Sequence, residues 1–120
     1  MSLDPIIQDL KLPASVQPYA ASLNVDISPD DGMYHGNRHH YFSCGASALI
    51  CIVHSLGLSG VSKPGRILDF GSGAGRVTRW LRAAYPDAVI HACDIRSGIS
   101  SSSNKAAMPA RGCRERTLPL

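Results

Sequence analysis

The stretch ILDFGSGAGR, residues 67–76, most constrains what this chain can fold into. A short apolar run typical of a strand leads directly into a turn that contains Gly71, Gly73 and Gly75. Glycines at this spacing indicate a backbone that needs positive φ angles or that a ligand approaches closely. Asp69 lies two residues before the first glycine, so a ligand of this turn has to tolerate a carboxylate.

The segments around the turn predict a strand, a helix and a second strand. Residues 66–70 have the near-continuous apolar character of a strand that is buried on both faces, and residues 88–95 predict the second strand. The helix between them, residues 76–85, would bury Val77, Trp80, Leu81 and Ala84 on one face. Because strand–helix–strand units place their strands parallel, we expect an α/β fold.

The segments before the first strand divide into two parts. Residues 1–37 are rich in proline and glycine and predict an irregular lead-in, with at most a helical turn near residues 16–23. A helix capped by Ser43 should follow and end at Gly57 or Gly60, and it marks the start of the domain at residues 38–96.

Arginines recur on the helix after the glycine turn, at Arg76, Arg79 and Arg82. Their spacing could suggest a nucleic-acid stripe, but no platform of interleaved aromatic residues supports it, since Trp80 belongs to the apolar face of the helix. We therefore expect these three side chains to form a solvated outer face, with no nucleic acid as a partner.

Length and composition exclude several other classes of protein. A chain of 120 residues with 44% hydrophobic and 18% charged residues is typical of one globular domain, and its net charge of +3 is small. Asp4 and Asp9 argue against a signal peptide, and the apolar stretch at residues 46–53 is shorter than a membrane helix. A cytoplasmic location without a membrane partner is expected, and the absence of CxxC pairs predicts no metal site.

Two classes of ligand suit a glycine turn between a strand and a helix: dinucleotides and S-adenosylmethionine. Asp94, 19 residues after Gly75, can accept hydrogen bonds from the ribose hydroxyls that both contain. The dinucleotide pattern G-x-G-x-x-G requires a third glycine where this chain has Arg76. Asp69 would also repel a phosphate about 6 Å away by roughly 3 kcal/mol, whereas it attracts the ammonium and sulfonium groups of S-adenosylmethionine.

ILDFGSGAGR resembles motif I of the class I S-adenosylmethionine-dependent methyltransferases, and HACDI is similar to the end of their second strand. The resemblance extends over residues 34–95 and implies the N-terminal part of a Rossmann-like methyltransferase fold. It also implies S-adenosylmethionine as the cofactor. In the family, the positions of Gly71, Gly73 and Gly75 hold the methionine moiety, that of Asp69 faces its amino group, and that of Asp94 binds the ribose. Tyr41, Ser43 and Gly45 are weaker candidates for its carboxylate end.

The family pattern stops after the second strand. Residues 97–120 have a serine run, scattered basic residues and no strand–helix alternation, so we expect a disordered or frameshift-like tail. The expected function is therefore an incomplete methyltransferase domain, with no identified catalytic residue or methyl acceptor. Two alternatives stay open: a non-enzymatic remnant with weak or no cofactor binding, and a dinucleotide-binding oxidoreductase fragment.

Overall fold

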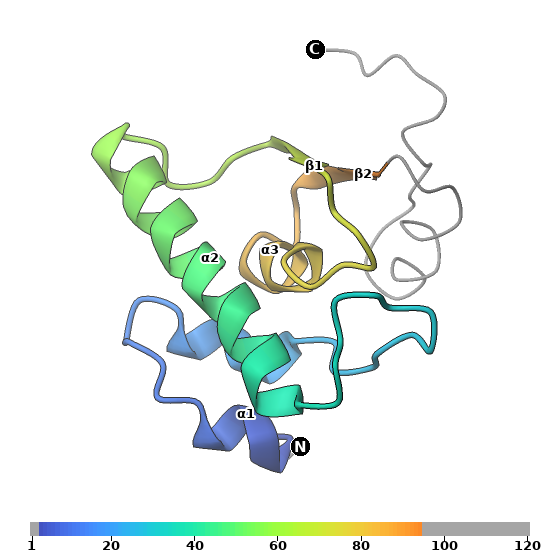
Figure 1. Cartoon of the computed structure of the whole chain (residues 1–120). Helices are drawn as coiled ribbons and strands as arrows, with labels where there is room; N and C mark the ends of the chain where they lie inside the picture. Colours follow the sequence, from blue (N-terminus) through green and yellow to red (C-terminus); the bar gives the residue numbers. More distant parts are fainter. Residues whose placement is uncertain (1–2, 95–120) are drawn as a thin grey trace.

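The computed structural model describes residues 3–94, so the tail predicted for residues 97–120 lies outside the described residues. Helices and strands alternate only in the second half of this range (Figure 1). In chain order the elements are α1 (Pro5–Asp9), the 3₁₀ helix η1 (Gln17–Ser22), α2 (Arg38–Leu58), β1 (Arg66–Phe70), α3 (Thr78–Ala84) and β2 (Val89–Cys93).

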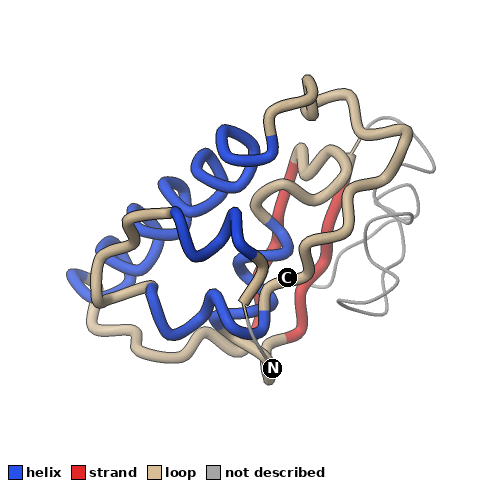
Figure 2. The backbone as a smooth tube through the Cα atoms, turned by 90° about the horizontal axis from the view of Figure 1, so that it is seen from below, coloured by secondary structure: helices blue, strands red, loops and turns tan. Residues whose placement is uncertain are grey.

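Strands β1 and β2 form a two-stranded parallel sheet, which confirms the predicted strand–helix–strand unit. In their register, Arg66 lies opposite Val89 and Phe70 lies opposite Cys93. The two strands run side by side in Figure 2, with the helices to one side of them. The described chain is thus a small mixed helix and strand domain built on this sheet.

The prediction that the first strand is buried on both faces is wrong for β1. Ile67 and Asp69 are half-buried on the face toward the helices, whereas Leu68 is 46% exposed and Phe70 is 75% exposed. Within residues 3–94, the helices all lie on one side of the sheet, and β1 pairs with β2 alone (Figure 1). One edge of β1 is therefore unpaired in the described part of the chain, as expected for an incomplete sheet.

The lead-in belongs to the hydrophobic core. The expected helical turn near residues 16–23 is present as η1, and α1 is a helix that the sequence pattern did not indicate. These two elements and the turn between them bury apolar side chains against α2 and α3: Ile7, Leu10, Val16, Ala20 and Leu23. The proline-rich composition thus shortens the helices without preventing burial.

An ion pair joins the first two α-helices. The Asp4 carboxylate accepts a hydrogen bond from the Ile6 amide at 2.9 Å, which caps α1, and lies 3.0 Å from the guanidinium of Arg38 in the first turn of α2. The hydrogen bonds from these two groups lower the pKa of Asp4.

Helix α2 begins six residues earlier than the Ser43 cap would place it. Its N-cap is Asn37, whose side-chain oxygen accepts a hydrogen bond from the His40 amide at 3.0 Å. Asparagine and serine cap helices about equally well, so packing decides between them. Starting at Arg38 lets the helix bury Tyr41 and Phe42 in the core.

By length and composition alone, α2 could cross a membrane, so the prediction that the apolar stretch is too short for this is wrong. A core helix passes the same test, and the first half of α2 is buried against other elements through Tyr41, Phe42, Ala46 and Leu49. The expectation of no membrane partner stays a prediction.

Helices α2 and α3 approach each other closely at Gly45. A Cβ atom at this position would lie 2.5 Å from the Arg76 carbonyl oxygen and 2.5 Å from Cδ1 of Trp80. The added Cβ atom would therefore meet a main-chain carbonyl and the rigid indole of Trp80, which is fully buried. Neither group can move aside at low energetic cost.

We expect Gly45→Ala to destabilise the domain by about 1–3 kcal/mol, because the added methyl group overlaps the Arg76 carbonyl and the Trp80 ring. Gly57→Ala is the matched control on the same helix, since a Cβ there meets nothing within 4 Å. The control should gain about 0.5–1 kcal/mol from higher helix propensity. Urea unfolding of both variants measures the difference, and equal stabilities would contradict the close approach.

Candidate functional site

The glycine turn lies at the carboxyl end of β1 and has the backbone conformation that the sequence suggested. Gly71, Gly73 and Gly75 have φ angles of +75°, +56° and +99°. The amides of Gly71 and Ser72 donate to the Cys93 carbonyl at 2.6 and 2.9 Å. The turn is thus attached to the last residue of β2, so that both strand ends contribute to one site.

Asp94 follows β2 and its side chain reaches the same turn. Its carboxylate accepts a hydrogen bond from the Gly73 amide at 2.9 Å, across 21 residues of sequence. Gly71 remains open, since a Cβ there would meet nothing within 4 Å. The structure therefore brings four of the predicted site residues together: Gly71, Gly73, Gly75 and Asp94.

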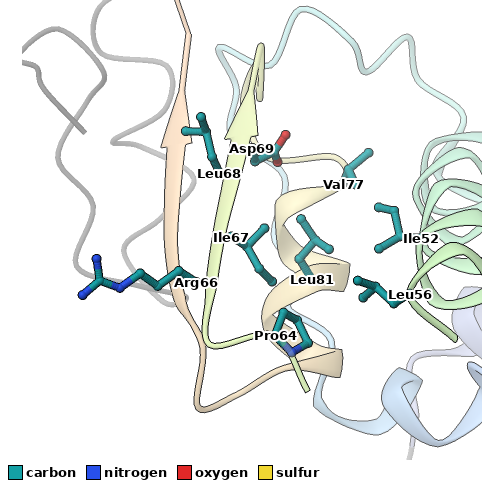
Figure 3. Close-up of a pocket in the computed structure, with 9 residues that line it drawn as sticks. All are labelled: Ile52, Leu56, Pro64, Arg66, Ile67, Leu68, Asp69, Val77 and Leu81. Atoms are coloured by element: carbon teal, nitrogen blue, oxygen red, sulfur yellow. The ribbon is translucent and has the colours of Figure 1, made fainter. Parts of the chain in front are cut away.

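Asp69 points to the helix side of β1, where it borders a pocket of about 330 Å³ between β1, α2 and α3 (Figure 3). Its carboxylate accepts a hydrogen bond from the Thr78 hydroxyl at the start of α3. The rest of the lining is mostly apolar, with Ile52 and Leu56 of α2 facing Ile67 of β1. Burial raises the pKa of Asp69, and the Thr78 hydrogen bond partly offsets this effect.

Arg79 is the main polar group buried beside the glycine turn. It is 6% exposed, and its Nε donates to the Gly75 carbonyl at 3.0 Å. Its Nη1 donates to the carbonyls of Asn24 and Asp26 at 3.0 and 2.6 Å. The guanidinium thereby fixes the lead-in to the turn.

The same guanidinium continues into a chain of hydrogen bonds. Nη2 of Arg79 donates to the Tyr41 hydroxyl at 3.1 Å, and that hydroxyl donates to the Asp31 carboxylate. The other oxygen of Asp31 accepts from the Met33 amide at 2.9 Å. Burial, followed by the hydrogen bond to Asp31, raises the pKa of Tyr41, so it stays protonated.

The expectation that Arg76, Arg79 and Arg82 form a solvated face is wrong. Arg79 is buried and the other two are half-buried, because the lead-in covers the side of α3 that a helical wheel assigns to solvent. Nη1 of Arg82 donates to the Pro86 and Ala88 carbonyls at 2.8 and 2.9 Å. No local signal in the sequence distinguishes these structural arginines from solvated ones.

The three weaker candidates before the glycine turn have contacts within the protein. Tyr41 belongs to the hydrogen-bond chain from Arg79, and Gly45 provides the close approach of α2 to α3. The Ser43 hydroxyl lies 3.5 Å from Nδ1 of His39, one turn earlier on α2.

The site combines a glycine turn with positive φ angles, called the cradle below, with negatively charged side chains. Asp94 bonds the turn, Asp69 lies on β1 just before it and bonds Thr78, and the buried cation Arg79 is engaged by carbonyls and Tyr41. Within residues 3–94, no three His, Cys, Asp or Glu side chains lie close enough to hold a metal ion. Such a site favours a ligand with positive charge and hydroxyl donors over a phosphate.

Comparison of the sequence with models of known protein families and with characterised proteins gives no match.

We expect Arg79→Met to lower the free energy of unfolding by at least about 2 kcal/mol, because the carbonyls of Gly75, Asn24 and Asp26 lose a charged donor. Arg66→Met is the matched control, since Arg66 is exposed and its side chain points away from the pocket in Figure 3. The control should stay within about 0.5 kcal/mol of the parent protein. Chemical denaturation measures the free energy of unfolding of both variants. A loss in Arg79→Met no larger than that of the control would refute the structural role of Arg79.

The raised pKa of Asp69 predicts a pH dependence of stability. The folded chain holds this proton to higher pH than the unfolded chain, whose pKa is near the ordinary value of 3.8. The stability that protonated Asp69 contributes is therefore lost as the pH rises from 3.8 through the raised pKa. As the pH rises through this interval, the free energy of unfolding of the parent protein should fall relative to that of Asp69→Asn. A flat or opposite trend would contradict the shift.

Proposed function

We propose that this chain carries the S-adenosylmethionine site of a class I methyltransferase domain, in the N-terminal part of a Rossmann-like fold. The supporting observation is the meeting of a positive-φ glycine turn and Asp94 at the carboxyl ends of two adjacent parallel strands. Crevices at this end of parallel sheets are where α/β proteins bind nucleoside ligands.

The residues of the site fit the cofactor. Gly71 leaves open space over the turn for the methionine moiety, and the Asp94 carboxylate can exchange the Gly73 amide for the ribose hydroxyls. S-adenosylmethionine, when bound, supplies an electrophilic methyl group on a sulfonium. The chain itself supplies the cradle and the negative charge of Asp94 and Asp69, which favour that cation.

The dinucleotide alternative is less favoured by the same geometry. The position of its third glycine is Arg76, a side chain that is half-buried beside the turn. Asp69 and Asp94 would both stand near a pyrophosphate, and one carboxylate at about 6 Å lowers phosphate affinity by about a hundredfold.

Cofactor binding without methyl transfer is the activity we propose for this chain. Within residues 3–94, one face of the sheet lies away from every helix and one edge of β1 is unpaired. In addition, no side chain of the described site stands as a general base toward the turn, since the Asp94 carboxylate is bonded to Gly73. Methyl transfer would need an acceptor surface that these elements do not form.

Calorimetric titration of the full chain should show micromolar affinity for S-adenosylmethionine and no binding of NADH at the same concentrations. Asp94→Asn should lower the affinity for S-adenosylmethionine by about tenfold to a hundredfold, because a charge-assisted hydrogen bond to the ribose is lost.

Asp87→Asn is the matched control for this titration. Asp87 is exposed and precedes β2, at the opposite end of the strand from Asp94, so its replacement should leave the affinity unchanged. Binding of NADH alone would favour the oxidoreductase fragment. A chain that binds neither compound would be the non-enzymatic remnant.

A further inference from the structure

Met33 lies against the glycine turn. A Cβ atom on Gly73 would overlap the Cε methyl of Met33 and would lie 3.3 Å from its sulfur. The thioether of the lead-in is thus packed on the one glycine of the turn whose amide bonds Asp94. Residues 28–37, which carry Met33 over the turn, are called the strap below.

The side chain of methionine is chemically the same chain that S-adenosylmethionine presents, without the adenosyl group and the positive charge. A surface that accepts the sulfur and methyl group of Met33 has the shape and apolar character to accept the same atoms of the cofactor. In the proposed site the methionine moiety lies along Gly71, Gly73 and Gly75, so the cofactor and Met33 cannot both occupy the surface of Gly73.

The strap is held by hydrogen bonds at Asp31 and by the packing of Met33 and Tyr34 against the core. Asp31 is 7% exposed and accepts hydrogen bonds from the Tyr41 hydroxyl and the Met33 amide, whereas Pro29, Asp30 and the end of the strap are exposed. Gly36, just before α2, has a φ of +91° and open space around it. Asp31 is the one buried residue of the strap, and local opening of such a segment costs less free energy than global unfolding.

The anchor is connected to the turn itself. Arg79 donates both to the Gly75 carbonyl of the turn and to the Tyr41 hydroxyl that holds Asp31. A change in the turn on ligand binding therefore acts on the same guanidinium that supports the strap.

We propose that Met33 is an internal competitor of the cofactor: the strap closes the site with its own thioether, and S-adenosylmethionine binds only when the strap moves off Gly73. This inference rests on the proposed function. The measured affinity of the full chain is then reduced by the fraction of time that the strap is closed.

Met33→Ala tests the competition directly. It removes the thioether from Gly73 and should bind S-adenosylmethionine about tenfold more tightly than the parent chain. Met33→Leu is the matched control, since it keeps an apolar side chain of similar size and should stay within about twofold of the parent. Unchanged or weaker binding by Met33→Ala would overturn the inference while the proposed function stands.

Tyr41→Phe tests the anchor while keeping the hydrogen bond from Arg79 to the Gly75 carbonyl. It keeps the ring but removes the hydroxyl between Arg79 and Asp31, so we expect tighter cofactor binding. Tyr34→Phe is its control, because Tyr34 meets Tyr41 only through a ring contact, with centroids 5.7 Å apart. Equal affinities of the two variants would show that the anchor does not hold the strap closed.

A methyl NMR signal gives a readout that is independent of affinity. The chain has three methionines, Met1, Met33 and Met108, and Met33→Leu assigns the signal of interest. On titration of the parent chain with S-adenosylmethionine, the Met33 methyl signal should move away from its position in the closed strap. Binding without this shift would overturn the competition, and no binding by any variant would overturn the proposed function together with it.

Discussion

The guanidinium of Arg79 joins the glycine turn, the lead-in and α2, which are not paired with one another as strands. It donates to Gly75 in the turn, to the carbonyls of Asn24 and Asp26 in the lead-in, and to Tyr41 of α2. Its charge also lies 5.2 Å from the Tyr41 ring centroid and 5.7 Å from that of Phe42. An unpaired buried guanidinium costs much free energy. The turn, the lead-in and α2 therefore keep this arrangement in the folded state, because breaking it would leave the charge unpaired.

This arrangement explains why a two-stranded sheet can support a defined site. Two strands alone are marginal, and within residues 3–94 the helices cover only one face of this sheet. The remaining order comes from the other side of α3, where α2 approaches through Gly45 and the lead-in packs its apolar residues. The site therefore depends on residues far from it in sequence as much as on the strands that carry it.

Local patterns predicted the elements well because their signals are local. The apolar run before Gly71 and the glycine spacing predicted β1 and its turn, and the face of Trp80 and Leu81 predicted the buried side of α3. The sequence placed Asp94 at the end of β2, and its bond to the Gly73 amide is a finding of the structure that follows because parallel strands end at the same edge of a sheet. The start of α2 was missed because Asn37 and Ser43 are both competent caps and only the burial of Tyr41 decides between them.

The contacts of the lead-in could not be predicted in this way. An amphipathic pattern says which face of α3 is apolar, but the burial of Arg79 depends on a segment more than 50 residues earlier. Likewise, nothing in the residues around Met33 indicates that its sulfur lies on Gly73. Long-range contacts of this kind are set by the packing of the whole domain.

The acceptors that Arg79 finds in the lead-in are main-chain oxygens. Every residue carries a carbonyl group, whatever its side chain. This contact therefore depends on the path of the backbone and not on which residues stand at positions 24 and 26. Asp26 is exposed and supplies only its carbonyl oxygen to the contact, which leaves its side chain free to change during evolution. The arginine has no such freedom, since a lysine has a single nitrogen and cannot span the same set of acceptors.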